Sequence, residues 1–339
     1  MDRTELESRA RSLIDATLVW DNHACMPLRP LDTGFLPQLE RHRRAGFDVV
    51  MLNAGFGEQD IEAHVRMVAS LRHWISEHSG HYLLLERTAD AEEARRSGRL
   101  AVGLDIEGAN AIGDQLSLIE MYRDLGVWWM AMAYNRNNRV GGGCQDDHDP
   151  GLSNFGRAVI REMERVGMAV CVSHTGHRTA HEAIEYASKP VIFSHSNCSA
   201  LREHPRNVPD ELIRACAATG GLVGINGVGI FLGANDIASE TYARHIDHVV
   251  QLVGPRHVNI ALDYVFDRQE LDEYIEKMKH TFPPGLGYDL GGRFVPPEQL
   301  TEIVAILMDW GYDDGALTAI LGGNLMQLMK TIEGARCHV

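Results

Sequence analysis

Side chains that could bind a metal ion or move a proton stand at the ends of apolar segments along this 339-residue chain. Three of them are histidines and two are carboxylates, and neutral imidazole and carboxylate both suit Zn²⁺. A fold that brings them together could hold one or two such ions and activate water for hydrolysis. In chain order, the residues at the segment ends are His23, Asn53, Glu107, Tyr134 with Asn135, His174, His195, Asn226 and Asp263.

The segments that lead to these residues are short, continuous and apolar, which is typical of parallel strands covered on both faces. Helix-like stretches, with apolar side chains three or four residues apart, separate most of them, and several end at glycine. The predicted strands are 17–23, 47–53, 100–107, 127–135, 168–174, 190–195, 222–226 and 258–263. The predicted helices include 115–125, 155–166, 179–187, 210–219 and 241–253.

Strands that alternate with helices fit either a barrel or an open, doubly wound sheet. The polar strand ends favour the barrel, because a barrel brings the carboxyl ends of all its strands to one mouth. An open sheet would spread them along the edges of a crevice. We therefore predict an α/β fold, a (β/α)8 TIM-type barrel with its site at that mouth. No linker, repeat or low-complexity tract divides the chain, so residues 1–339 are predicted to form a single domain.

Composition narrows the classes of partner. The net charge is −15, and an acidic surface repels phosphate backbones, which argues against nucleic-acid binding. The charged N-terminus lacks the apolar core of a signal peptide, and no run of about 18 apolar residues is present to span a membrane. Six scattered cysteines suit reduced thiols, so a cytoplasmic protein with a small-molecule substrate is expected. A homodimer is compatible with the sequence.

Cys25 stands two residues after His23, and on an extended strand the two side chains would share a face. Two interpretations of this cysteine stay open. It is either a thiolate ligand of the same ion as His23, or a buried thiol that packs as a small hydrophobic side chain. A carboxylate such as Glu107 could bridge two ions through its two oxygens.

At these residues the chain resembles the membrane (renal) dipeptidase family of metallopeptidases, within the amidohydrolase-like barrels. The resemblance runs from Asp21 to about Ile332. The segments that carry it are Ile106-Glu107-Gly108, Gly151-Leu152-Ser153-Asn154-Phe155-Gly156, Ser173-His174, Phe193-Ser194-His195-Ser196, His204-Pro205-Arg206-Asn207-Val208-Pro209-Asp210 and Leu321-Gly322-Gly323-Asn324.

The resemblance implies roles for individual residues. Glu107 would bridge two zinc ions, with His174 and His195 on one ion and His23 on the other. Arg206 would bind the C-terminal carboxylate of the substrate, for which its planar fork is suited. The resemblance also implies that Asp263 handles the proton and faces the substrate amine.

Three positions differ from the family pattern. The motif His-x-Asp is His23-Ala24-Cys25 here, and the run Asp-Phe-Asp-Gly after the eighth strand is Asp263-Tyr264-Val265-Phe266-Asp267. Tyr134 replaces the family's catalytic histidine after the fourth strand, and a phenol could donate a hydrogen bond to a developing oxyanion. The predicted site thus has Asp263 and Tyr134 as catalytic residues, Arg206, Tyr134 and Asn135 as substrate-binding residues, and His23, Cys25, Glu107, His174 and His195 as metal ligands.

Two hypotheses from different classes follow. The first is a zinc-dependent hydrolase that uses metal-activated water on a small amide, most simply a dipeptide or dipeptide-like compound with a free carboxylate. It would hold one or two Zn²⁺ ions. The second is a divergent barrel with a depleted metal site, which binds a small ligand without dipeptidase activity. Metal content separates the two.

Overall fold

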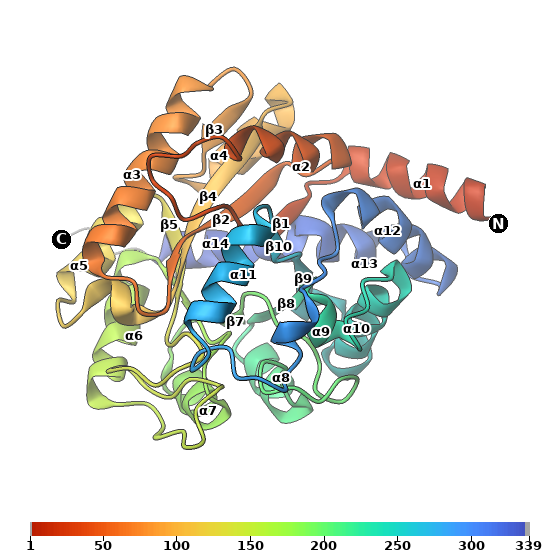
Figure 1. Ribbon diagram of the computed structural model, residues 1–339. Helices are drawn as coiled ribbons and strands as arrows, with labels where there is room; N and C mark the ends of the chain where they lie inside the picture. Colours follow the sequence, from red (N-terminus) through yellow and green to blue (C-terminus); the bar gives the residue numbers. More distant parts are fainter. Residues whose placement is uncertain (1, 336–339) are drawn as a thin grey trace.

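The structure is a computed structural model that describes residues 2–335. A curled sheet of parallel strands forms its centre, and helices surround the sheet (Figure 1). In sheet order the strands are β10 (Tyr264–Val265), β1 (Trp20–Cys25), β2 (Val49–Phe56), β4 (Leu100–Glu107), β5 (Val127–Ala131), β6 (Ala169–Cys171), β7 (Val191–Phe193), β8 (Leu222–Asn226) and β9 (Val258–Ala261), while β3 (Tyr82–Leu84) pairs with β4.

Strand β10 joins the two ends of this order. It follows β9 closely along the chain and pairs in parallel with β1, where Cys25 lies opposite Val265. Between the two strands, the backbone N–H of Asp263 donates to the carbonyl of His23 over 2.9 Å. The ladder therefore returns to its first strand, which confirms the predicted α/β barrel.

Helices pack on the outer face of the sheet (Figure 1). The five predicted helices are present as α5 (Ser117–Asp124), α6 (Asn154–Val166), α7 (His177–Tyr186), α8 (Asp210–Ala218) and α10 (Ser239–Val253). The others are α1 (Arg3–Ala16), α2 (Glu40–Ala45), α3 (Ile61–Glu77), α4 (Thr88–Ser97), α9 (Gly229–Leu232), α11 (Arg268–Lys277), α12 (Leu300–Asp309), α13 (Asp314–Thr318) and α14 (Asn324–Gly334). Within residues 2–335, no helix has both the length and the apolar character needed to cross a membrane.

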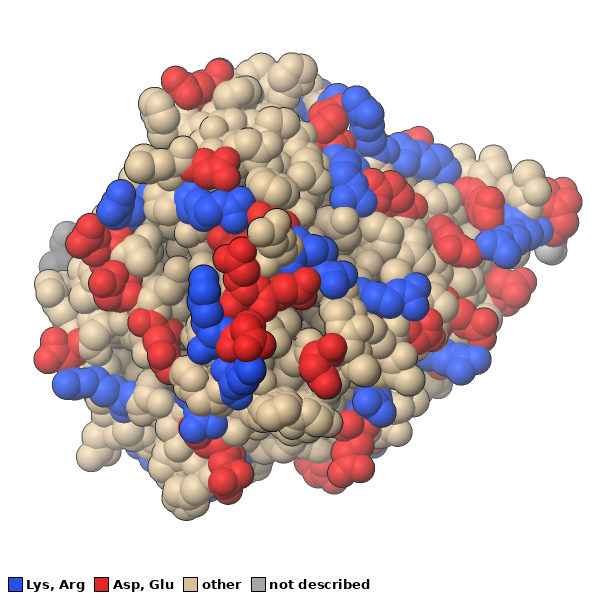
Figure 2. All heavy atoms as spheres, in the orientation of Figure 1, with Lys and Arg blue, Asp and Glu red and all other residues tan. Residues whose placement is uncertain are grey.

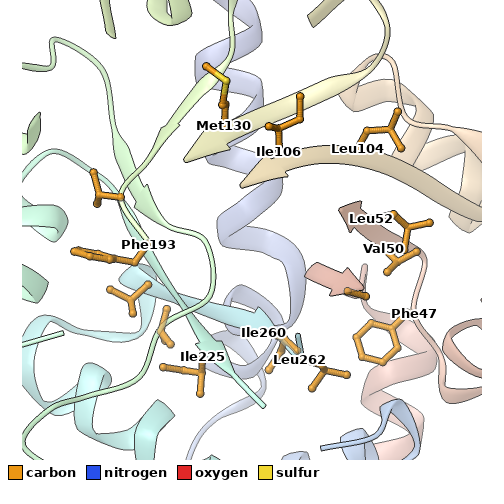
Figure 3. Close-up of a cluster of buried hydrophobic side chains, with 14 of the residues drawn as sticks. Phe47, Val50, Leu52, Leu104, Ile106, Met130, Phe193, Ile225, Ile260 and Leu262 are labelled. Carbon is orange, nitrogen blue, oxygen red and sulfur yellow. The ribbon is translucent and has the colours of Figure 1, made fainter. Parts of the chain in front are cut away.

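Side chains alternate between the outer and inner faces of the barrel, as the period of two along a strand requires. On β4, Leu104 and Ile106 belong to the core between sheet and helices, shown in Figure 3. The residues between and after them, Asp105 and Glu107, are buried on the other face, toward the barrel interior. This alternation places two carboxylates of one strand inside the barrel.

The strand boundaries differ from the prediction at the carboxyl ends. Strands β5, β6 and β7 end two to four residues early, before the polar residues that were assigned to them. Strand β9 likewise ends two residues before the predicted Asp263. At three of these four ends the backbone explains the difference, because Asn135, His174 and Asp263 have positive φ values of 55°, 62° and 50°. An extended strand cannot continue through that left-handed conformation. Strands β3 and β10 were not predicted, and they have only three and two residues.

Candidate active site

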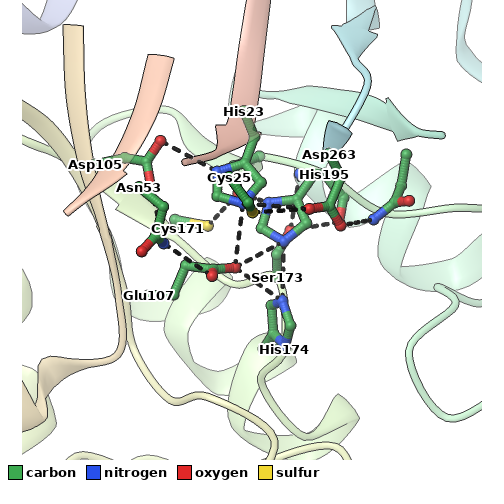
Figure 4. Close-up of polar contacts among 12 residues, drawn as sticks. His23, Cys25, Asn53, Asp105, Glu107, Cys171, Ser173, His174, His195 and Asp263 are labelled. Carbon is green, nitrogen blue, oxygen red and sulfur yellow. Dashed lines mark hydrogen bonds and ion pairs between the residues drawn. The ribbon is translucent and has the colours of Figure 1, made fainter. Parts of the chain in front are cut away.

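Three imidazoles converge on one carboxylate at the carboxyl ends of the strands (Figure 4). Glu107 ends β4, and its Oε1 lies 3.0 Å from His174 Nε2 and 3.0 Å from His195 Nε2. The third nitrogen, His23 Nε2 on β1, lies 3.6 Å from the same oxygen. The oxygen is buried and accepts no hydrogen bond of good geometry within the described residues. Three ring nitrogens and a buried carboxyl oxygen therefore surround one point, which is an arrangement that suits a cation.

The other ring nitrogens of two of these histidines are held by acceptors. His23 Nδ1 lies 3.1 Å from Asp105 Oδ2, and His174 Nδ1 lies 2.7 Å from Asn135 Oδ1. A carboxylate or amide oxygen cannot donate, so each Nδ1 carries the proton. Fixing the tautomer through the far nitrogen is how proteins orient histidine ligands of metals.

Burial sets the charge of the histidines nearest to Glu107. It lowers the pKa of His174 and of His195 well below the usual value, so both rings are neutral near pH 7. Burial also raises the pKa of Glu107 to about 8. The two Nε2 atoms lie only 2.9 Å apart. Neutral imidazole nitrogens brought this close beside a buried carboxyl suit a bound divalent cation.

A second group of possible ligands shares His23. Its Nε2 lies 3.5 Å from Cys25 Sγ and 3.5 Å from Asp263 Oδ1. Cys25 Sγ is in turn 3.4 Å from that aspartate oxygen. The ladder between β1 and β2 shifts register between Asp21 and Ala24, and such an irregularity re-aims side chains. The structure thus places Cys25 beside His23, as the spacing predicts, and adds Asp263 to the group.

Arg206 is a buried cation next to the histidines. Its side chain is 3% exposed, and its Nη2 lies 2.9 Å from His174 Nε2 and 3.2 Å from the carbonyl of His195. Its Nε has no hydrogen-bond partner among the described residues. Within residues 2–335 its hydrogen-bond partners include no carboxylate. A buried guanidinium that hydrogen-bonds to no carboxylate is costly, so this position favours an anionic ligand.

Two adjoining cavities open from the site. One, of about 90 Å³, contains Arg206 and Asp263, and the other, of about 70 Å³, contains Asn53 and Phe56. Cys25, Glu107 and Tyr134 line both. A larger open cleft of about 720 Å³ between α1 and α12 has no histidine or cysteine in its described lining, so the chemistry lies in the smaller pair.

Helix α11 covers these cavities. Leu271 lines both of them, Ile275 lines the first and Tyr274 the second. The opposite face of the helix is charged, and acidic and basic side chains gather there in the middle of the view in Figure 2. Helix α11 is therefore amphipathic, as expected for a helix that lies between a pocket and water.

Tyr134 lies flat against a predicted metal ligand. Its ring stacks on that of His174 at a centroid distance of 4.2 Å, with the planes 22° apart. Burial raises the pKa of the Tyr134 hydroxyl well above its usual value, so the group stays protonated and can donate. The residue therefore lines the pocket as a neutral donor, while its catalytic role stays a prediction.

Asn135 makes its side-chain hydrogen bonds within the protein. Its Oδ1 faces His174 Nδ1, and its Nδ2 donates to the carbonyl of Thr281 over 3.3 Å. Both ends of the amide are therefore engaged within the protein. Asn135 borders the Arg206 side of the pocket, but its contacts show a residue that orients His174. The predicted contact with substrate stays a prediction.

Three residues that support the site received no role from the sequence. Asp105 holds His23, Asn53 Nδ2 donates to Glu107 Oε2 over 2.9 Å, and Asn226 Nδ2 donates to Asp263 Oδ2 over 2.7 Å. Asn53 and Asn226 were recognised only as polar strand ends. Asp105 had a signal of its own, because it stands two residues before Glu107 on one strand and so shares its face.

Parallel strands closed into a barrel, with histidines and carboxylates gathered at the carboxyl mouth, define a barrel of the metal-dependent hydrolase type. The sequence model of the membrane dipeptidase family, peptidase family M19, matches residues 34–281. The chain belongs to this family.

Relatives and solved structures agree with that assignment. Dipeptidase verJ from Clonostachys rogersoniana is 27% identical over 303 residues, which cover 89% of this chain and 72% of that protein. An uncharacterized dipeptidase, C965.12 of Schizosaccharomyces pombe, is 34% identical over 180 residues, 50% of this chain and 42% of that protein. The match therefore spans less than half of the yeast protein.

Among solved structures, an amidohydrolase from Pseudomonas aeruginosa superposes with a TM-score of 0.87 and 26% identity, covering 96% of this chain and 99% of that one. A metallo peptidase from Rhodobacter sphaeroides, liganded with a phosphinate mimic of the dipeptide L-Ala-D-Ala, has a TM-score of 0.76 and 19% identity, with 93% and 99% covered. At 19% identity, the likeness to the Rhodobacter sphaeroides structure shows a shared fold alone.

Proposed function

We propose that this chain is a zinc-dependent hydrolase of a dipeptide, or of a dipeptide-like amide with a free carboxylate. The observation that carries the proposal is the convergence of three imidazoles on Glu107 beside the buried guanidinium of Arg206, which hydrogen-bonds to no carboxylate within the described residues. The family membership and the name of verJ, a dipeptidase, support the same reaction class.

The donor set fits zinc, because neutral imidazole, carboxylate and thiolate are all zinc ligands. Glu107, His174 and His195 would hold one ion. His23 and Cys25 would hold another, with Asp263 close to them. Zinc bound here would supply Lewis acidity toward the scissile carbonyl and promote the ionisation of water near neutral pH.

The chain's own residues would bind the substrate and move the proton. Arg206 would anchor the substrate carboxylate. Because its guanidinium touches His174, that carboxylate must belong to the residue directly after the scissile bond. This distance favours a dipeptide over a longer peptide. A guanidinium can grip a carboxylate with two parallel hydrogen bonds, which also fixes the orientation of the bond to be cleaved.

Asp263 would handle the proton. Asn226 holds its Oδ2, which leaves Oδ1 facing Cys25 and His23. Oδ1 would accept a proton from the attacking water and return it to the leaving amine. Tyr134 would donate its hydroxyl hydrogen to the oxyanion that develops on the carbonyl oxygen.

The experiment combines metal analysis with hydrolysis. The purified protein is analysed for zinc and then offered glycyl-leucine and the C-terminal amide of the same dipeptide. We expect one or two zinc ions per chain and cleavage of the free acid in strong preference to the amide. A protein that holds no zinc and cleaves neither compound would refute the proposal and favour a barrel that only binds a small ligand.

A further inference from the structure

The cavity that contains Arg206, here called the Arg206 cavity, has an apolar wall on the side away from the reaction centre. The side chains of that wall form a cluster of their own, separate from the two cores of the barrel. Its members are Val228, Ile230, Phe231, Phe282, Tyr288 and Phe294. They come from the loop after β8, from α9 and from the segments after α11.

The charged groups of the Arg206 cavity all belong to the reaction centre. The lining contains Glu107, Asp263 and Arg206 but no other acidic or basic side chain apart from His174. The single phenol of the apolar wall, Tyr288, already accepts a hydrogen bond from Gln145 Nε2 over 2.7 Å. A side chain that enters this space from the reaction centre therefore meets carbon atoms and the Tyr288 hydroxyl, and no charged group beyond those of the reaction centre.

The position of Arg206 fixes which part of a substrate enters. Arg206 and Asp263 line the same cavity, and neither lines the cavity that contains Phe56. The anchored carboxylate and the amine released beside Asp263 belong to one residue, the leaving residue. Its side chain must project from the same carbon atom, so it lies in the Arg206 cavity.

We infer that the leaving residue carries a large apolar side chain, such as that of leucine. This inference rests on the proposed function, because it uses the anchoring role of Arg206. About 90 Å³ is several times the space of roughly 10–15 Å³ that one water needs, so a glycine or alanine would leave a wetted apolar void. Filling it removes apolar surface from water, whereas a charged side chain would be buried without a partner.

The test compares dipeptides that share an N-terminal glycine and differ in the second residue: glycine, and alanine, leucine, aspartate and lysine, the last four in both the L and D forms. Hydrolysis by the zinc-loaded protein gives kcat/KM, and calorimetry gives the Kd of the free second amino acids as product ligands. We expect kcat/KM to rise at least about tenfold from alanine to leucine, and to fall below the alanine value for aspartate and lysine.

The outcomes separate this inference from the proposed function. Hydrolysis that is equal across the series, or fastest for a charged residue, overturns the inference and leaves the hydrolase in place. No hydrolysis, with leucine bound more tightly than alanine, refutes the proposed function but supports the apolar site. No hydrolysis and no difference in binding overturn both.

Two variants locate the effect. Val228→Phe narrows the Arg206 cavity and should abolish the preference for leucine over alanine. Leu28→Phe adds the same ring to the other cavity and should change both rates by a common factor. If Val228→Phe melts far below the parent protein, Ile230→Ala replaces it, and the enlarged cavity should shift the optimum to phenylalanine. An unchanged preference in the folded Arg206-cavity variant would overturn the assignment.

Discussion

Removing the Asp105 carboxylate should weaken one zinc site and spare the other. Asp105 is fully buried and holds His23 Nδ1 over 3.1 Å, while its other oxygen lies 3.4 Å from Asn53 Nδ2, a longer contact than the 2.9 Å bond from Asn53 to Glu107. A hydrogen bond to a charged group contributes about 1.5–3 kcal/mol. If that energy orients His23 for its ion, Asp105→Ala raises the zinc Kd of that ion by about 10- to 150-fold, since 1.4 kcal/mol is tenfold.

Asn135→Ala is the matching change on the other site. The bond it removes, 2.7 Å from His174 Nδ1, is one between neutral groups. Such a bond contributes about 0.5–1.5 kcal/mol, so the zinc Kd of the ion at His174 should rise roughly 2- to 13-fold. The ion at His23 should keep its affinity.

The assay is competition between the protein and a chromophoric chelator for zinc, fitted to two sites. Asp48→Ala is the control, because Asp48 accepts the backbone N–H of Val19 over 2.9 Å at the opposite end of the barrel. It should lower the free energy of unfolding in urea, on the order of 1 kcal/mol, without changing zinc affinity. If the Asp105 and Asn135 variants weakened the same ion equally, or neither weakened any, the assignment of one support to each site would be refuted.

Three further substitutions test single residues. Cys25→Asp should raise the zinc stoichiometry toward two, because a carboxylate offers two oxygen atoms where a thiolate offers one longer bond, and elemental analysis showing no change would identify Cys25 as a packing residue. Arg206→Lys keeps the charge but loses the planar fork, so kcat/KM should fall for the free-acid dipeptide and hold for its C-terminal amide; an equal fall on both would indicate a structural role. Tyr134→Phe should lower kcat by about 10²–10³ with zinc content unchanged, and full activity would make Tyr134 a wall of the pocket.

The barrel could be predicted because most of its buried strands leave two signals in the sequence. The apolar run reports two covered faces, and the polar residue after it reports a mouth. Leu100–Glu107 shows this, since its predicted and observed bounds agree. The same rule failed after β6, where His174 was taken as strand. Its φ of 62° depends on contacts with distant segments, and no local pattern records these.

The candidate site shows the same division. Histidines and carboxylates at strand ends could be found because strand ends meet in space. Arg206 could not be found this way, because it lies in the loop between β7 and α8, and only the resemblance assigned it. Asp105 could have been predicted, because the alternation of side chains along β4 places it on the same face as Glu107. Which atom of Asn135 bonds to which partner depends on Thr281, 146 residues away in sequence.

Tyr134, one of the positions where the chain departs from its family, belongs to a set of connected contacts around His174. Tyr134 stacks on His174, and Asn135 holds the Nδ1 of the same ring. The thiol of Cys144 donates to Asn135 Oδ1 over 3.4 Å, and its backbone N–H donates to the carbonyl of His174 over 3.0 Å. Gly143 permits this approach, because a Cβ there would lie 2.3 Å from the backbone of Asn135.

Two of these residues, Asn135 and His174, have strained backbone with positive φ, and Tyr134 precedes the first of them. Such conformations cost of order 1–3 kcal/mol each and persist only where the surroundings impose them. Around His174 the surroundings are Tyr134, Asn135 and the glycine-rich loop that ends at Cys144. The segment from Tyr134 to Cys144 therefore supports one predicted metal ligand, His174. A substitution at Gly143 should weaken zinc binding at the predicted site of His174 more than at the predicted site of His23.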